Sequence, residues 1–230
     1  MTKKENPQLA LNMTLAGPWI RAGLTRFDVV EHSWFIYDRN SAELMEFLRT
    51  PATHQSDFLR IVTSGPSASW SFWGTFNQRL HNFLASAVTL VDHARRLTDY
   101  YQEDAPDFVK QFRLKNQAVA ELPEAQFLRE LRNYMLHCSQ PPVITHISFR
   151  VGEPPAIKFA ARQLLEQQDR PWKSAVRQYL EAYPENDGPE ILVDVQRYVG
   201  EMSSVFAWLF EQRQRLGTLA PERFLVEIHD

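Results

Sequence analysis

The sequence predicts a mainly α-helical protein, built as an up-and-down bundle of long amphipathic helices rather than around a sheet. Two observations support this. Apolar residues recur at three- and four-residue steps over long windows, which is the period of a helix with one buried side. Proline stands at or near the start of several of these windows, where a helix tolerates it best, and turn-forming residues separate them. The alternation that is typical of strands is confined to a short segment in the second half of the chain.

Composition supports one folded unit and excludes several classes of protein. The chain has 230 residues, 44% of them hydrophobic, with 15 Phe and 6 Trp, so it can bury a sizeable core. The net charge of −3 disfavours non-specific coating of DNA or RNA, although a local cationic pocket stays open. A single cysteine, Cys138, excludes an internal disulfide and suits the cytosol. Without a signal-peptide pattern or an apolar run of about 18 residues, we expect a soluble cytoplasmic protein with no membrane segment.

The first part of the chain reads as an N-terminal extension. Residues 1 to about 25 are polar and then turn-rich, which favours a loosely attached arm. Two short helices are expected next, from Asn40-Ser41 and after Ser56. We therefore predict an arm with short helices over residues 1–67 and a helical bundle over residues 68–230.

The clearest helix follows the break at Ser64-Gly65-Pro66-Ser67. Its apolar stripe comprises Phe76, Leu80, Phe83, Leu84, Ala87, Leu90, Val91, Ala94 and Leu97. A second bundle helix is predicted from Asp107 to Glu121, and a third from Pro123 until Pro141-Pro142 stops it.

A small β-hairpin is predicted after the third bundle helix, over residues of about 143–161. Residues 143–151 alternate apolar and polar side chains, and the turn Gly152-Glu153-Pro154-Pro155 leads into the partner segment Ala156 to Ala161. Two helices complete the chain, from Trp172 to Tyr183 and from about Pro189 to Leu216.

Several common catalytic and cofactor motifs are missing. The sequence contains no GxxxxGK[ST], GxGxxG or HExxH segment and no CxxC pair, so nucleotide-dependent transfer of the common kinds and structural zinc lack support. We therefore predict no cofactor and no metal site. A lone metal site formed by His81 and a distant carboxylate is the alternative, weighed against a solvated or capping histidine.

The third bundle helix carries the polar residues that suggest chemistry. Arg132 and His137 are five positions apart, which corresponds to a rise of about 7.5 Å and a rotation of about 140°. Asn133 and His137 share a side of the helix at i and i+4, and the long stem of Arg132 can bring its guanidinium round toward them.

These three side chains suit RNA cleavage without a metal. An imidazole can take the proton of a ribose 2′-hydroxyl or give one to the leaving 5′-oxygen, while a guanidinium holds the phosphate. We take Arg132, Asn133 and His137 as candidate catalytic residues. The structural alternative is a helix end whose Arg and His stabilise the negative end of the helix dipole.

The segment Arg132-Asn133 followed by His137, placed after a long amphipathic helix, resembles the Arg-x4-6-His motif of HEPN domains. The resemblance covers roughly residues 70–217 and implies a homodimer whose paired motif helices form a composite ribonuclease cleft. It also implies a hydrolase acting as a toxin, with an antitoxin partner, or in phage defence; other members are inactive interaction modules. The N-terminal extension and the hairpin depart from the simplest members.

Two function hypotheses follow. The first is a metal-independent HEPN-type endoribonuclease that binds RNA as a homodimer, its two-fold axis near the helix from Pro123 to Ser139. The second is an inactive helical-bundle module that binds a protein partner through an apolar patch at residues 19–37 or 70–73. Neighbouring polar groups such as Asn77, His81 and Asp92 could assist the first but favour a solvated helix face, and Tyr134 could stack on a base or lie in the core.

Overall fold

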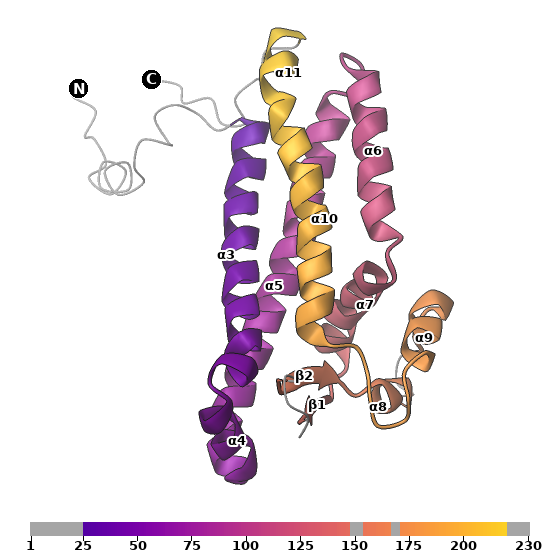
Figure 1. Cartoon of the computed structure of the whole chain (residues 1–230). Coiled ribbons are helices and arrows are strands. Elements are labelled where there is room, and N and C mark those ends of the chain that lie inside the picture. Colours follow the sequence, from indigo (N-terminus) through magenta and orange to yellow (C-terminus); the bar gives the residue numbers. More distant parts are fainter. Residues whose placement is uncertain (1–24, 148–153, 167–170, 220–230) are drawn as a thin grey trace, which may run out of the picture.

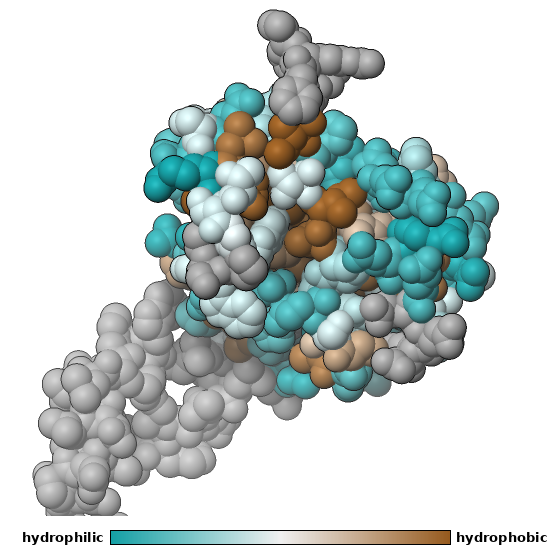
Figure 2. Space-filling model, turned by 90° about the horizontal axis from the view of Figure 1, so that it is seen from below, coloured by the Kyte–Doolittle hydropathy of each residue, from teal (hydrophilic) through white to brown (hydrophobic). Residues whose placement is uncertain are grey.

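The computed structural model describes residues 25–147, 154–166 and 171–219. The described chain is mainly helical with one two-stranded sheet, which confirms the predicted fold class at that level. Helices α3, α5, α6 and α10 run side by side as long columns, and α7, α8, α9 and the hairpin gather at one end (Figure 1). Figure 2 views the molecule from that end, where apolar groups emerge between hydrophilic ones.

Helix α3 spans Arg26–Thr53 and begins with a capping box. The Thr25 side chain accepts a hydrogen bond from the Asp28 amide at 3.2 Å, while the Asp28 carboxylate accepts one from the Thr25 amide at 2.9 Å. The helix therefore starts well before the expected position near Ser41, and it packs along α5 and α10. A short second helix, α4, follows over Gln55–Thr63.

The length of α3 was hidden in the sequence because serines occupy positions on its buried stripe. Ser33 and Ser41 are buried between apolar neighbours. Each hydroxyl donates to the carbonyl four residues earlier, at 2.8 Å and 2.7 Å respectively, so neither is left unsatisfied. Ser33 also lies 2.6 Å from His93 Nδ1, which links α3 to α5.

Helix α5, Pro66–Tyr100, confirms the predicted long helix. All the residues of its predicted stripe are buried except Val91, which is half-buried. Helices α6, Pro106–Ala120, and α7, Pro123–His137, each begin with proline, as the sequence indicated.

The hairpin is also confirmed. Strands β1, Val143–His146, and β2, Ala156–Phe159, pair antiparallel with Val143 opposite Phe159. The predicted strand residues 148–151 lie outside the described residues. Where the second strand was expected to continue to Ala161, the chain instead enters a short helix, α8, Ala161–Glu166.

The last part of the chain contains three helices. Helix α9 covers Ser174–Glu181, α10 covers Ile191–Glu211 and α11 covers Arg213–Leu219, so the predicted helix ending near Leu216 is interrupted at Gln212. The loop before α10 requires glycine at position 188, because a Cβ there would lie 1.9 Å from the Phe159 carbonyl oxygen.

Arg213 ties α11 to the start of α3. Its guanidinium contacts Asp28 at 2.7 Å and Glu31 at 2.5 Å, and it lies over the Phe27 ring. In this way the beginning and the end of the described chain are held together at one end of the bundle. No helix in the described ranges is both long and apolar enough to cross a bilayer.

Candidate functional site

Helix α7 positions the candidate residues by burying its opposite side. Phe127, Leu131 and Tyr134 are at most 2% exposed and fix the rotation of the helix in the bundle. The helix ends at His137, since Cys138 leaves helical geometry while its amide still donates to the Tyr134 carbonyl at 2.8 Å. We call the other side of α7, which carries Arg129, Arg132, Asn133, Leu136 and His137, its outer side.

The structure separates Arg132 from His137. Arg132 is half-buried and lines a pocket, whereas His137 is exposed at the last position of the helix and does not line that pocket. Asn133 is half-exposed, and by helical geometry it lies on the same side as His137. No hydrogen bond or ion pair joins these three side chains within the part of the chain that the structure describes. Within the described part of the chain, no contact therefore assembles Arg132 and His137 into one site.

The pocket beside Arg132 is walled by α5, α6, α7 and α10 and has a volume of about 130 Å³. Its walls are mostly apolar, and three arginines, Arg95, Arg129 and Arg132, contribute to its lining. Tyr198 of α10 also lines it, and burial raises the pKa of its hydroxyl to about 12, so the hydroxyl keeps its proton at neutral pH. The apolar part of the lining consists of Leu84, Ala87, Val88, Val91, Val119, Ala120, Ala125, Leu128 and Met202.

The three arginines differ in how their charge is balanced. Arg95 pairs with Asp92 of its own helix at 3.3 Å. Arg129 and Arg132 make no ion pair or hydrogen bond in the described ranges, and the Nε of Arg132 is buried without a partner there. Two positive charges on successive turns of α7 are thus left uncompensated by the described fold.

The inner side of α7 shows the opposite arrangement. Glu124 and Glu130 are 3% and 5% exposed. Each lies 2.8 Å from a cation of another segment, Glu124 from Arg197 and Glu130 from Lys173, in an ion pair that lacks hydrogen-bond geometry at the carboxylate oxygen. These carboxylates have a structural role.

A third buried carboxylate lies close to this group. Asp194 of α10 accepts a hydrogen bond from the Tyr179 hydroxyl, with O–O distances of 2.9 and 2.8 Å to its two oxygens. The pKa of Asp194 is raised to about 7, chiefly by burial; the Tyr179 hydrogen bond and the charge of Arg197 act against this rise, and the charge of Glu124 adds to it. This group is buried among structural residues and lines no part of the pocket beside Arg132.

The other residues considered from the sequence line no described pocket together with His137. Tyr134 is buried, stacks on Trp172 at 5.6 Å and has its hydroxyl 2.8 Å from Ser139, so it belongs to the core and is not open to a base. Asn77 and His81 line a different groove, together with Trp70, whereas Asp92 lines the pocket of Arg132.

Sequence reasoning missed Arg129 as a member of the site. The signal was present, because Arg129 and Arg132 are three residues apart on a predicted helix and therefore neighbours on its surface. Nothing in the sequence indicated that Arg95 of α5 meets α7 across a pocket.

Comparison of the chain with protein-family models, with characterised proteins and with solved structures gave no match. In the described ranges, no group of three or more His, Cys, Asp or Glu side chains is arranged to hold a metal ion.

Proposed function

We propose that this chain binds RNA through the outer side of α7 and cleaves it without a metal, as an endoribonuclease of the HEPN type. One observation carries the proposal: Arg129 and Arg132 are uncompensated within the described structure, although the buried carboxylates on the inner side of the same helix are each paired. A phosphate group is the natural partner for two adjacent guanidinium groups, since it accepts charge-assisted hydrogen bonds from both.

The roles of the residues follow from their chemistry. Arg132, assisted by Arg129, holds the phosphate and stabilises the charge that builds on it as the 2′-oxygen attacks. His137 is exposed and can exchange a proton with the attacking 2′-hydroxyl or the leaving 5′-oxygen. Asn133, which lies beside His137, orients either the imidazole or the phosphate.

The separation of Arg132 from His137 makes a second chain part of the proposal. A two-fold pairing of α7 outer sides would place His137 of one protomer opposite Arg132 of its partner, and it would supply groups to both sides of the phosphorus. Leu136 supports this arrangement. It lies between Asn133 and His137 in the sequence and is 46% exposed, and the partner protomer would cover it at the two-fold axis. Among roles known for HEPN proteins, a cytoplasmic toxin with an antitoxin partner, or a phage-defence nuclease, corresponds to such an activity.

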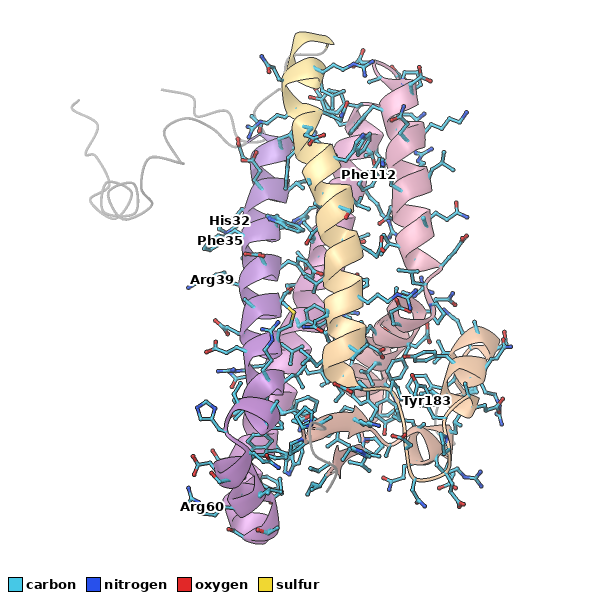
Figure 3. The ribbon with its side chains drawn as sticks, viewed as in Figure 1. His32, Phe35, Arg39, Arg60, Phe112 and Tyr183 are labelled. Carbon is cyan, nitrogen blue, oxygen red and sulfur yellow. The ribbon has the colours of Figure 1, made fainter. Side chains whose placement is uncertain are left out.

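The test is RNA cleavage by the purified full chain in the presence of a chelator. We expect His137→Ala and Arg132→Met each to lower the rate at least 100-fold, with unchanged circular dichroism and thermal unfolding. His32→Ala is the control, because His32 is likewise an exposed histidine but lies on α3 (Figure 3). Cleavage that persists in both variants, or that His32→Ala reduces equally, would contradict the proposal.

Assembly is tested separately by light scattering at micromolar concentration. We expect a dimer that Leu136→Glu converts to a monomer, since the substitution places two like charges at the proposed axis. Phe35→Glu on α3 is the matched control and should leave the dimer intact. A wild-type monomer would remove the composite site from the proposal.

A second candidate function is a non-enzymatic interaction module, favoured by exposed apolar side chains on α3 and α5. Phe35 and Ile36 on α3 are 60% and 43% exposed, and Trp70 on α5 is 80% exposed. In Figure 3, Phe35 points outward from the same side of α3 as His32 and Arg39. This function predicts no RNA turnover, together with a partner whose binding is weakened by Phe35→Ser or Trp70→Ser but not by His137→Ala.

A further inference from the structure

We propose that the pocket between α5, α6, α7 and α10 binds a small organic anion, made of one carboxylate or phosphate group and a compact apolar body the size of a single ring. This site goes beyond RNA cleavage. It shares Arg129 and Arg132 with the proposed RNA surface, but a binding experiment without RNA tests it separately.

The apolar side chains that line the pocket favour a ligand with an apolar body. Leu84 and Ala87 of α5, Leu128 of α7 and Met202 of α10 are buried residues that line it. Because these side chains come from separate helices of one packed bundle, the shape of the pocket is fixed by the core. A ligand that fills it removes apolar surface from water on both sides.

Arg132 supplies the recognition of the anion. Its Nε is buried without a hydrogen-bond partner in the described structure, and its side chain lines the pocket. The guanidinium makes no ion pair or hydrogen bond within the described ranges, so a carboxylate or phosphate oxygen in the pocket would give this cation a charge-assisted partner. Arg129 and the Tyr198 hydroxyl line the same space and add a second cation and a donor.

The volume of the pocket limits the size of the body. An engineered apolar cavity of about 150 Å³ holds one benzene molecule. The volume here is about 130 Å³, which accommodates a body of one ring or a short branched chain but not two fused rings. The chemical class is therefore that of benzoate or phenyl phosphate.

The experiment measures binding to the full chain by titration calorimetry with benzoate, benzamide, acetate, phenyl phosphate and 2-naphthoate. We expect benzoate or phenyl phosphate to bind at least tenfold more tightly than benzamide, which lacks the charge, and than acetate, which lacks the ring. The tighter of the two identifies the head group. The two-ring naphthoate should bind at least tenfold more weakly than benzoate.

Three results would overturn the inference. Equal binding of acetate and benzoate would mean that exposed arginines merely collect anions. Equal binding of benzamide and benzoate would mean that the negative charge does not contribute to binding. A lack of binding by both benzoate and phenyl phosphate would exclude the proposed ligand class.

Substitutions test whether benzoate binds in this pocket. Arg132→Met should weaken benzoate at least tenfold, whereas Arg49→Met, on an exposed part of α3, should not change it. Ala120→Phe should fill the pocket and abolish binding, and Ala118→Phe is its matched control because Ala118 is exposed on the same helix and does not line the pocket. If Ala120→Phe does not fold, the Arg132→Met result decides, and undiminished binding by that variant would refute the site.

Discussion

The two sides of α7 differ in whether their charged side chains have ion-pair partners. On the inner side, Glu124 and Glu130 are buried and each lies 2.8 Å from a cation of another segment. On the outer side, Arg129 and Arg132 have no such partner among the described residues. Burying a charge is costly unless it is paired, so the inner pairs are a requirement of the fold. The outer arginines answer no such requirement, and both proposals assign them a ligand.

The largest effect is expected from the buried carboxylate beside the inner pair. Asp194 has a pKa of about 7, raised by burial from its ordinary 3.8, so the folded state holds its proton more tightly than the unfolded state does. The resulting stability is fully present below about pH 4 and is lost as the pH rises through about 7. Asp194→Asn cannot ionise, so the stability of the wild type should fall relative to the variant by up to about 1.4 kcal/mol per pH unit over this window.

Urea unfolding of both proteins between pH 4.5 and 8 measures this difference. Comparison with the variant removes the contributions of other groups, such as Asp28, whose pKa is lowered and whose effect has the opposite sign. Parallel curves for the two proteins would show that Asp194 is not buried as a neutral group.

The next effect comes from breaking an inner pair. Arg197→Met leaves the Glu124 carboxylate buried without its cation, and we expect the free energy of unfolding to fall by about 1–3 kcal/mol. The expected loss of free energy of unfolding is smaller than for a fully buried ion pair. The reason is that the Arg197 side chain is 63% exposed, so water partly screens the interaction. Urea unfolding at pH 7 is the measurement. A loss no greater than that of Arg129→Met would remove the distinction between the two sides.

A smaller effect is expected on the outer side. Arg129→Met and Arg132→Met each relieve repulsion between like charges three residues apart and keep the apolar stem, so stability should change by less than about 0.5 kcal/mol or rise slightly. The same urea experiment tests this. A loss of 2 kcal/mol or more from either variant would mean that the arginine has a structural partner and would weaken both proposals.

The smallest expected effect is on the salt dependence of RNA binding. Each arginine that contacts a phosphate of a single strand should contribute about 0.7 to the slope of log K against log salt concentration. Arg129→Met and Arg132→Met should each reduce that slope by about this amount, measured by fluorescence anisotropy with a short labelled RNA. Arg49→Met is the control and should leave the slope unchanged.

The sequence predicted best those elements whose apolar residues repeat without interruption. The stripe of α5 was readable because all nine of its predicted positions are apolar; eight of them are buried and the ninth, Val91, is half-buried. Helix α3 was underestimated because Ser33 and Ser41 stand in its buried stripe and satisfy their hydroxyls locally. The break of the last helix at Gln212 carried no proline or glycine signal.

For the site, helical geometry was enough to predict that Asn133 and His137 share a side of α7 and that Arg132 lies about 140° round the helix from His137. The pocket was not predictable, since its lining comes from four helices and depends on how they pack. Nor could the sequence tell paired from unpaired charges: Glu124 meets Arg197, which is 73 positions away, and Arg129, which lies between two paired glutamates, meets no partner in the described structure.

The contact of Arg213 with Asp28 and Glu31 has a consequence for how the protein is made. These partners are separated by 185 and 182 positions in sequence. On the ribosome, α3 can pair with α5 as soon as both have emerged, but α10 begins 91 residues after α5 ends, and Arg213 comes 113 residues after it. At ordinary rates of synthesis that interval is on the order of ten seconds. During this interval, the apolar surfaces of α3 and α5 that α10 later covers are exposed to chaperones and to other nascent chains.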